Sequence, residues 1–424
     1  MVQLLPSPEL AELPAKIFTL DNGLTLIHQH LPVTPVVVAD VWVRAGASAE
    51  PESWSGIAHF LEHMIFKGSP EVAVGEFDWV IENTGGIANA ATSHDYAHFY
   101  LTTANSHIAE TLPYLANILL QASIPDEEFI RERDVVLEEI RSSYDDPDWL
   151  GFQTLCQTLY QSHVYKRSIL GDVDLLMQHT PDLMRCFHRT HYQPENMTLV
   201  LVGGIEAESA VSMANQAFSQ FSLRSECPRS PIEAEPPLIG VRRHELQLPR
   251  IEQARLLMGW IGPGIEDLEV GVGLDMLSVI LAGGQCSRLV QELREEKQLV
   301  LDICGQFSLQ KDSSLFTITA WLEPQYLDRV EKIICDRVWQ LANEPLLEVE
   351  LARTKRLLLN DYIFSTETPG QLAGIYGYYN TIATLDQCTS YPAVIKKITA
   401  EKLQQVADLY LSPERYASVI LKPC

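Results

Sequence analysis

The feature that most limits how this chain can fold is a segment near its middle, LRSECPRSPIEAEPPLIG at residues 223–240, which is rich in proline and charge. The segment has neither helical nor strand periodicity, which is typical of a linker. It divides the 424 residues into two parts of similar length, and a chain this long ordinarily holds two or more domains. We therefore predict a first domain over residues 1–222 and a second over residues 241–424.

The two parts begin with a similar order of elements. In the first, residues 18–31 and 36–48 read as strands around an Asn-Gly turn, and a helix follows. In the second, residues 242–249 and 252–264 are strand-like and residues 269–284 are helical. Strand segments and long helices alternate later in both parts. This order predicts a duplicated α+β unit.

The composition narrows the classes of function. The formal charge is −25 and Lys and Arg form no cluster, which argues against nucleic-acid binding. Such acidity is most simply explained by solubility, and the alternative is an acidic cavity that attracts cationic peptides. No apolar run approaches the roughly 18 residues that a membrane span requires. The N-terminal residues have no basic leader before an apolar core, so we predict no secretory signal and a cytoplasmic location.

A metal site in this chain would need histidine and carboxylate ligands, because the eight cysteines are scattered and form no CxxC pair. The stretch HFLEH at residues 59–63 is a candidate. On a helix, His59 and His63 lie one turn apart on one face and can bind one ion. Glu62 falls between them, where it could poise a water, and catalytic zinc takes three protein ligands. The motif alone also fits two ordinary histidines on a surface helix.

A third ligand is sought in residues 124–147, which read as a helix. At about 100° per residue, Glu138 falls on a charged and solvated stripe, whereas Glu132 and Glu139 fall on another face. That solvated stripe also holds Arg131, Asp134 and Arg141. The other face holds Phe129, Val135 and Val136. Because a carboxylate on an apolar face is costly unless it is paired, we predict that Glu139 is a ligand and Glu138 a solvated charge.

These residues resemble the inverted-motif zinc peptidases, the family of pitrilysin, insulin-degrading enzyme and the mitochondrial processing peptidase. The stretch GIAHFLEHMIFKG at residues 56–68 is similar to the HxxEH helix of the family at every defining position. The third ligand of the family is a glutamate farther along the chain, and its spacing from the second histidine matches Glu139. The supporting acid seven residues earlier matches Glu132, which is expected to orient a ligand.

The resemblance covers almost the whole chain. Residues 85–100, GGIANAATSHDYAHFY, resemble the Gly-Gly…Asn-Ala…Thr strand of the family, and residues 191–204 resemble a strand late in its first domain. The resemblance implies two tandem homologous α/β-sandwich domains, as in the processing peptidase. Each has a mixed, mostly antiparallel sheet with helices packed on one face.

The activity that the resemblance implies is that of a zinc metalloendopeptidase with one zinc ion per chain. The ligands would be His59, His63 and Glu139, and the metal would lower the pKa of its bound water and polarise the scissile carbonyl. The catalytic carboxylates would be Glu62, as general base, and Glu132, as the supporting carboxylate that orients a zinc ligand.

Substrate binding is assigned by the same resemblance. The strand at Asn89 and Ala90 is expected to receive the peptide as an added β-strand, although Asn89 fits a turn residue after Gly-Gly equally well. In active relatives the second half supplies an Arg and, seven residues later, a Tyr that bind substrate or stabilise the oxyanion. Arg294 matches the Arg, but Leu301 occupies the Tyr position and has no donor. The alternative is that another tyrosine, such as Tyr376 or Tyr378, compensates.

Members of the family enclose unfolded peptides between two facing bodies, each made of two such domains. One chain of this length supplies one of these bodies. The resemblance therefore implies a second chain, and because Leu301 occupies the tyrosine position we predict a heterodimer in which a homologous subunit without HxxEH supplies the Arg–Tyr pair. The first alternative is a self-sufficient homodimeric oligopeptidase. The second is a non-catalytic structural subunit, like the core subunits of a respiratory complex, but such subunits have eroded ligands and here every one is intact.

Overall fold

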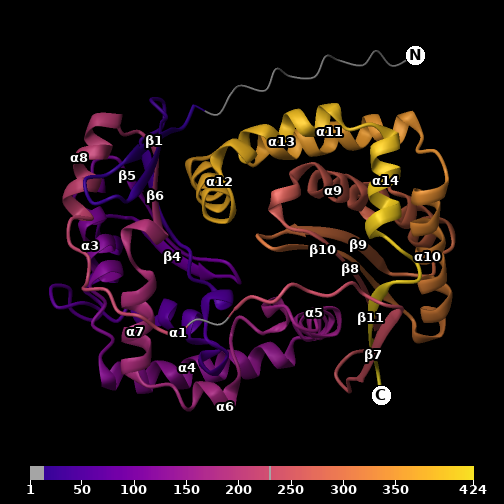
Figure 1. The fold of residues 1–424 in the computed structure, drawn as a ribbon, viewed down its shortest axis with the longest axis horizontal. Helices are drawn as coiled ribbons and strands as arrows, with labels where there is room; N and C mark the ends of the chain where they lie inside the picture. The colour runs from indigo at the N-terminus through magenta and orange to yellow at the C-terminus, as the bar shows by residue number, and fades with distance from the viewer. Residues whose placement is uncertain (1–13, 229–230) are drawn as a thin grey trace.

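Two β-sheets frame the structure, which is a computed structural model that describes residues 14–228 and 231–424 (Figure 1). The strands of the first sheet are β1 (Lys16–Thr19), β2 (Thr25–His30), β3 (Val36–Val43), β4 (Ile87–Thr92), β5 (Ala97–Ala104) and β6 (Met197–Gly203). Those of the second are β7 (Val241–Gln247), β8 (Ala254–Pro263), β9 (Asp302–Leu309), β10 (Ser313–Leu322) and β11 (Tyr416–Lys422). Each sheet therefore takes its strands from one predicted half, and the described residues within 223–240 form no helix or strand.

The helices follow the same division along the chain. The first half contains α1 (Ile57–Ile65), α2 (Glu76–Asn83), α3 (Ile108–Leu120), α4 (Asp126–Asp145), α5 (Pro147–Leu159), α6 (Val173–Leu176), α7 (Pro181–His191) and α8 (Ala207–Ala217). The second half contains α9 (Leu268–Ala282), the π-helical segment η6 (Val290–Glu296), α10 (Leu327–Asn343), α11 (Glu348–Phe364), α12 (Pro369–Ile382), α13 (Leu385–Lys397) and α14 (Ala400–Tyr410). None of the helices in the described part of the chain is long and apolar enough to cross a membrane.

The two sheets have the same topology. The first sheet runs β1-β2-β6-β3-β5-β4 and the second β7-β11-β8-β10-β9. The pair β2–β6 is parallel, as is β7–β11, and the remaining neighbours in both sheets are antiparallel. Without β1 the orders correspond strand for strand, which confirms the predicted duplication of a mixed, mostly antiparallel α/β unit.

One helix of each half packs on the sheet of the other half, which the sequence did not predict. Helix α5 buries Leu155 and Leu159 against Leu257 and neighbouring residues of the second sheet. Helix α12 buries Tyr376 against a cluster of the first sheet that includes Trp42. Figure 1 shows α5 beside the second sheet and α12 beside the first. The two domains therefore exchange helices, in addition to being joined by the linker.

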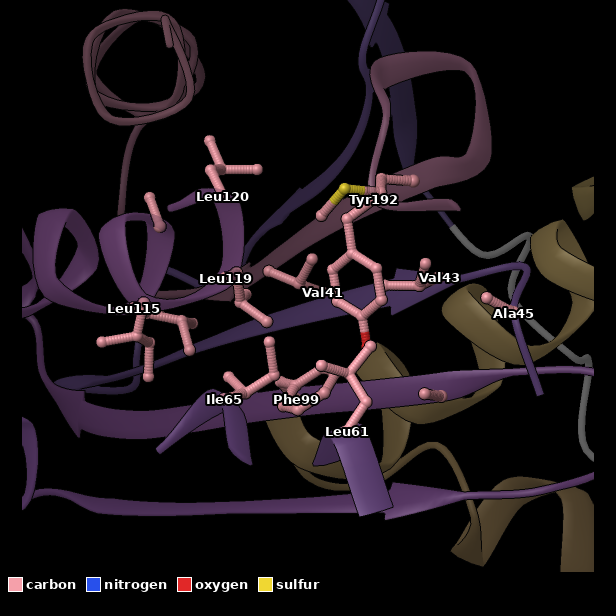
Figure 2. Packing of buried hydrophobic residues seen from close by; sticks show 14 of the residues in the cluster. Val41, Val43, Ala45, Leu61, Ile65, Phe99, Leu115, Leu119, Leu120 and Tyr192 are labelled. Carbon is pink, nitrogen blue, oxygen red and sulfur yellow. The ribbon is translucent and has the colours of Figure 1, made fainter. Parts of the chain in front are cut away.

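The main core of the first half lies between its sheet and helices α1 and α3 (Figure 2). Leu61 and Ile65 of α1 are fully buried, as are Val41 and Phe99 of the sheet and Leu119 of α3. Burying a side chain of this size contributes about 1.5–3 kcal/mol. The apolar stripe of α1 therefore fixes this helix on the sheet and determines where its remaining side chains point.

Candidate active site

Helix α1 begins at a glycine and packs through an apolar face. Its N-cap, Gly56, has a φ of 90°, a left-handed conformation that glycine adopts without strain. An added Cβ at Gly56 would also lie 2.8 Å from the Cα of Gly171, so no larger residue fits where these two backbone segments meet. Ile57, Phe60, Leu61 and Met64 are buried. Because this apolar stripe packs on the sheet, His59 and His63 point away from it side by side, and their ring centroids lie 4.9 Å apart.

Glu139 of α4 faces both histidines. One of its carboxylate oxygens lies 3.6 Å from His59 Nε2, and the other lies 3.4 Å from His63 Nε2. One ligand atom from each of the three residues lies within 4.8 Å of the others, and the described residues contain no second group of this kind. The structure thus brings together the three predicted ligands, which come from α1 and from a helix far along the chain.

The donor set fits a zinc ion. His63 Nδ1 lies 3.0 Å from Glu132 Oε1, and Lys67 Nζ lies 2.7 Å from the other oxygen of that carboxylate. In the neutral form of His63 that donates its Nδ1 hydrogen to Glu132, Nε2 has its lone pair on the side of Glu139 and can bind a metal. Glu132 therefore lies where an acid that orients a ligand should lie. Two imidazoles and a carboxylate are a common ligand set of catalytic zinc.

The protonation of the three residues follows from burial and contacts. Burial lowers the pKa of His59 to about 4, so its imidazole is neutral at pH 7. Burial also lowers the pKa of His63, but the hydrogen bonds that its ring donates to the Glu139 and Glu132 carboxylates outweigh burial and raise the pKa overall. The hydrogen bond with His63 holds the pKa of Glu139 below its usual value. The carboxylate and the neutral His59 are in the forms that bind metal.

Glu62 points to the same place from α1 and is held by the neighbouring sheet. Thr92 Oγ1, at the end of β4, donates to Glu62 Oε2 at 2.5 Å. Burial raises the pKa of Glu62, which brings it closer to the pH at which a carboxylate exchanges protons most effectively. The sequence matched Thr92 to a family motif without giving it a role, because no local pattern reports a contact between a helix and a distant strand.

The phase of α4 separates the two adjacent glutamates as predicted. Glu138 is exposed and pairs with Arg141 on the solvated side, whereas Glu139 faces α1. Phe129 and Val136 are buried, but Val135 is 50 % exposed. The expectation that Val135 belongs to an apolar contact face is therefore wrong. Val135 lies four residues from Arg131 and three from Glu138, both exposed, so it borders the solvated side of α4.

The predicted substrate strand is the edge of the first sheet. β4 pairs with β5 alone, and Asn89 is exposed within it. The turn lies earlier, at Gly85 with a φ of 68°, so the alternative that Asn89 is a turn residue is wrong. The Asn89 side-chain oxygen accepts from Ala90 N–H at 2.9 Å. An open strand edge of this kind can pair with an extended peptide.

The second-half residues lie apart from this cluster. Arg294 in η6 pairs with Glu295 at 2.9 Å and with Asp302 at 3.1 Å, and neither partner belongs to the first half. Leu301 is 53 % exposed. The alternative tyrosines are engaged elsewhere, since the hydroxyl of Tyr376 donates to Gln29 and that of Tyr378 to the Leu309 carbonyl. Neither hydroxyl is therefore placed to replace the tyrosine hydroxyl that is missing at position 301.

Known proteins match both halves. The family described as insulinase, peptidase family M16, matches residues 25–173, and the one described as the peptidase M16 inactive domain matches residues 179–358. Zinc protease PqqE of Helicobacter pylori is 27 % identical over 409 residues, covering 96 % of this chain and 92 % of that protein. YmxG of Bacillus subtilis, named an uncharacterized zinc protease, is 26 % identical over 420 residues, covering 96 % and 98 %.

Solved structures agree with this placement. The crystal structure of a protease from Helicobacter pylori superposes with a TM-score of 0.90 at 27 % identity, covering 96 % of this chain and 99 % of that one. A structure described as a peptidase M16 inactive domain from Pseudomonas fluorescens shares the fold, with a TM-score of 0.86 at 20 % identity and coverage of 97 % and 99 %. This chain therefore belongs to peptidase family M16, the insulinase family, whose members similar to it are named zinc proteases.

Proposed function

We propose that this chain is the zinc-binding catalytic subunit of a metalloendopeptidase that cleaves unfolded peptides. The observation that carries the proposal is the convergence of His59, His63 and Glu139, with the carboxylate of Glu62 beside them. A structural subunit would have no need of this set, since the buried Nδ1 of His59 has no hydrogen-bond partner among the described residues, which is costly to maintain.

His59, His63 and Glu139 would hold the zinc ion, one per chain. When bound, zinc acts as a Lewis acid that polarises the scissile carbonyl and makes a water molecule more acidic. Glu132 supports this set from behind, because its carboxylate fixes the ring of His63 while Lys67 compensates its charge. Such partners orient ligands and raise their basicity.

Glu62 is the proposed general base. Its carboxylate takes a proton from the attacking water and later returns it to the leaving amine. Two features of the chain suit it to both steps. Thr92 fixes one carboxylate oxygen, and burial keeps the pKa above its usual value. The other oxygen is left for the water.

The open edge of β4 is the proposed docking site for the substrate. An extended peptide paired with this edge would lie along Asn89 and Ala90, and its backbone would run past Thr92 toward Glu62. Backbone pairing requires the substrate segment to be free of its own secondary structure, so the proposal favours unfolded peptides. Arg294 is proposed to contact substrate only within an assembly, since its partners in this chain lie in the second half.

The assembly is proposed to be a heterodimer with a homologous chain that lacks HxxEH. Leu301 supports this choice, because it places an exposed apolar side chain where active relatives carry a tyrosine. Loss of one oxyanion donor typically lowers the rate by about a hundred- to thousandfold. A homodimer that acts alone is the alternative. The cytoplasmic location remains a prediction.

The test is hydrolysis of a quenched, unstructured peptide by the wild-type chain and by Glu62→Gln, each alone and mixed with homologous chains. We expect turnover by the wild-type mixture and none by the Glu62→Gln mixture, although both chains hold zinc. Glu138→Gln is the matched control and should be as active as wild type, because Glu138 faces solvent. Full turnover by Glu62→Gln would refute its role as base, and full turnover by the chain alone would refute the heterodimer.

A further inference from the structure

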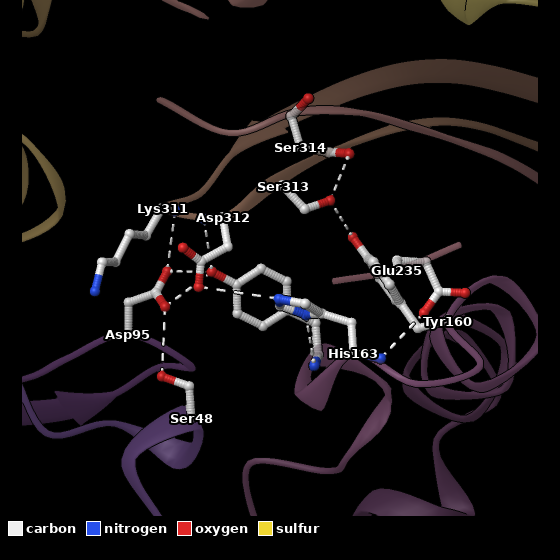
Figure 3. A network of polar contacts seen from close by, with 10 residues as sticks. Ser48, Asp95, Tyr160, His163, Glu235, Lys311, Asp312, Ser313 and Ser314 are labelled. Atoms are coloured by element: carbon white, nitrogen blue, oxygen red, sulfur yellow. Dashed lines mark hydrogen bonds and ion pairs between the residues drawn. The ribbon is translucent and has the colours of Figure 1, made fainter. Parts of the chain in front are cut away.

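A carboxylate in the turn between β4 and β5 contacts a hairpin of the second half of the chain (Figure 3). Both oxygens of Asp95 accept from the hydroxyl of Tyr165, each at 2.8 Å. The backbone N–H of Lys311, in the turn between β9 and β10, donates to Asp95 Oδ2 at 3.2 Å. Ser48 Oγ lies 3.5 Å from the other oxygen. Three segments that are distant in sequence therefore meet at Asp95.

The same hairpin is bonded to the loop that carries Tyr165. The hydroxyl of Tyr165 accepts from Asp312 N–H at 3.3 Å, and Tyr160 Oη lies 2.9 Å from Ser313 Oγ. Tyr165 is 1 % exposed, and burial raises its pKa, so it remains a neutral phenol that can donate to Asp95. Glu235 holds the loop itself, because its carboxylate accepts three consecutive backbone N–H groups, of Gln161, Ser162 and His163. The hairpin and this loop thus behave as one support for Asp95.

The opposite side of the turn is fixed by the first half. Ala47 N–H donates to the Ser93 carbonyl at 3.0 Å and Ser48 N–H to the His94 carbonyl at 2.8 Å. A Cβ at Gly46 would lie 2.2 Å from the Ser93 oxygen, so the two backbones are in direct contact. The turn is therefore held between η1 (Ala47–Ala49) and the second half.

The turn leads directly into the candidate active site. Ser93 follows Thr92, whose hydroxyl holds Glu62, and the strand before it is the open edge at Asn89 and Ala90. β4 pairs with one strand only, so the turn that follows it is, beside helices α1 and α2, one of the few contacts that fix its end. A shift at Asp95 would thus be transmitted along the backbone to Thr92 and to the strand edge.

We propose that Asp95 is a positioning residue through which the β9–β10 hairpin of the second half holds β4 in the geometry that binds substrate. The inference rests on the proposed function, since it concerns the strand edge assigned there to the substrate. It gives the second half a role within its own chain that does not depend on any metal ligand. Hydrogen bonds to an ionised carboxylate are among the stronger ones, which suits a contact that joins two domains.

The experiment changes the second half and measures the first. Lys311→Pro removes the one N–H that the hairpin donates to Asp95, and Lys311 does not have the positive φ that proline cannot adopt. Lys311→Ala is the matched control, because it keeps the N–H and removes the side chain. Asp95→Asn is the second variant, since an amide offers fewer acceptors to the same donors.

We expect Lys311→Pro and Asp95→Asn to speed hydrogen–deuterium exchange of residues 87–96 by about tenfold, the effect of losing one such bond. In the assembly that cleaves the quenched peptide, KM should rise by about as much while kcat changes less, because the strand edge contributes binding. Zinc affinity and exchange in β6 should stay at wild-type values, and Lys311→Ala should match wild type throughout.

Two results would overturn the proposal. In the first, exchange over residues 87–96 is the same in Lys311→Pro, Lys311→Ala and wild type. In the second, exchange rises equally in β6, which indicates general destabilisation. If the wild-type assembly cleaves no peptide, the proposed function fails, and the exchange measurement still decides whether the hairpin positions β4.

Discussion

The two halves share a strand order but differ in the helix that crosses each sheet. Helix α1 carries His59, Glu62 and His63 toward an accessible cluster, whereas α9, which follows β8 as α1 follows β3, contains no histidine and is buried along most of its length. Its central acid, Asp275, is partly buried and accepts a hydrogen bond from Tyr391. The fold therefore supplies a place for polar side chains in both halves, and among the residues that the structure describes only those of the first half suit a metal.

The comparison also shows how each half satisfies a partly buried acid. In the first half, Glu132 is compensated by His63 and Lys67. In the second, burial raises the pKa of Asp275 to about 6, which the hydrogen bond from Tyr391 only partly offsets. The phenol of Tyr391 donates one hydrogen bond to this carboxylate, whereas Glu132 contacts both a ring nitrogen and an ammonium group. The predictions below test this difference, beginning with the largest effect.

The largest effect is expected at the ligand itself. Glu139→Gln should weaken zinc binding by more than about a hundredfold, since loss of a ligand should exceed the 10- to 100-fold that loss of an outer partner costs. Glu138→Gln is the matched control and should bind zinc like wild type, because Glu138 pairs with Arg141 on the exposed side. Competition with a chelator measures both affinities. The reverse ranking would mean that the helix phase is wrong by one residue.

A smaller loss of zinc affinity is expected at Glu132, the carboxylate that contacts the ligand His63. Glu132→Gln should weaken zinc binding about 10- to 100-fold, because the amide no longer accepts both from His63 and from Lys67. The control in the other half is Glu292→Gln, which breaks ion pairs with Lys297 and Arg337. If the halves differ as described, that change leaves zinc affinity untouched. Equal losses in the two variants would show that zinc binding follows overall stability.

The exchanged helices should respond through stability. Gly377→Ala in α12 places a Cβ 2.0 Å from Trp42 Nε1, and such overpacking typically costs about 1–3 kcal/mol. Gly374→Ala in the same helix meets nothing within 4 Å and should stabilise it by about 0.5–1 kcal/mol, because alanine favours helix more than glycine does. Denaturant unfolding measures both. Equal effects would contradict the tight packing of α12 on the first sheet.

The smallest effect concerns the pH dependence of the second half. A carboxyl group whose pKa is raised by folding binds more protons in the native state, so Asp275 should lower the free energy of unfolding as the pH rises from about 4 to 6. Asp275→Asn should remove this component, about 1–2 kcal/mol over the range, while Tyr391, Asp361 and Tyr379 remain around the site. Unfolding curves at several pH values test it, and an unchanged slope would contradict the raised pKa.

The sequence predicted what local patterns and the family resemblance contain. HxxEH lies within one helical turn, and the phase of α4 separated Glu139 from Glu138, so both outcomes needed no tertiary information. The contact between Thr92 and Glu62 was missed, because it joins a strand to a helix thirty residues earlier. Apolar periodicity likewise predicts that a face of α5 or α12 is buried, but not which sheet it covers. The prediction for Val135 was wrong because this residue borders the solvated side of α4, and periodicity does not show how wide the covered face of a helix is.

The central claim is that the first half alone holds the zinc ion, through His59, His63 and Glu139. Native mass spectrometry of the zinc-loaded chain and of the His59→Ala/His63→Ala double variant tests it most directly, with circular dichroism to show that both are folded. We predict one zinc ion per wild-type chain, in line with one catalytic site, and none in the folded double variant. A zinc ion retained by the double variant, or a second ion in wild type, would contradict the claim.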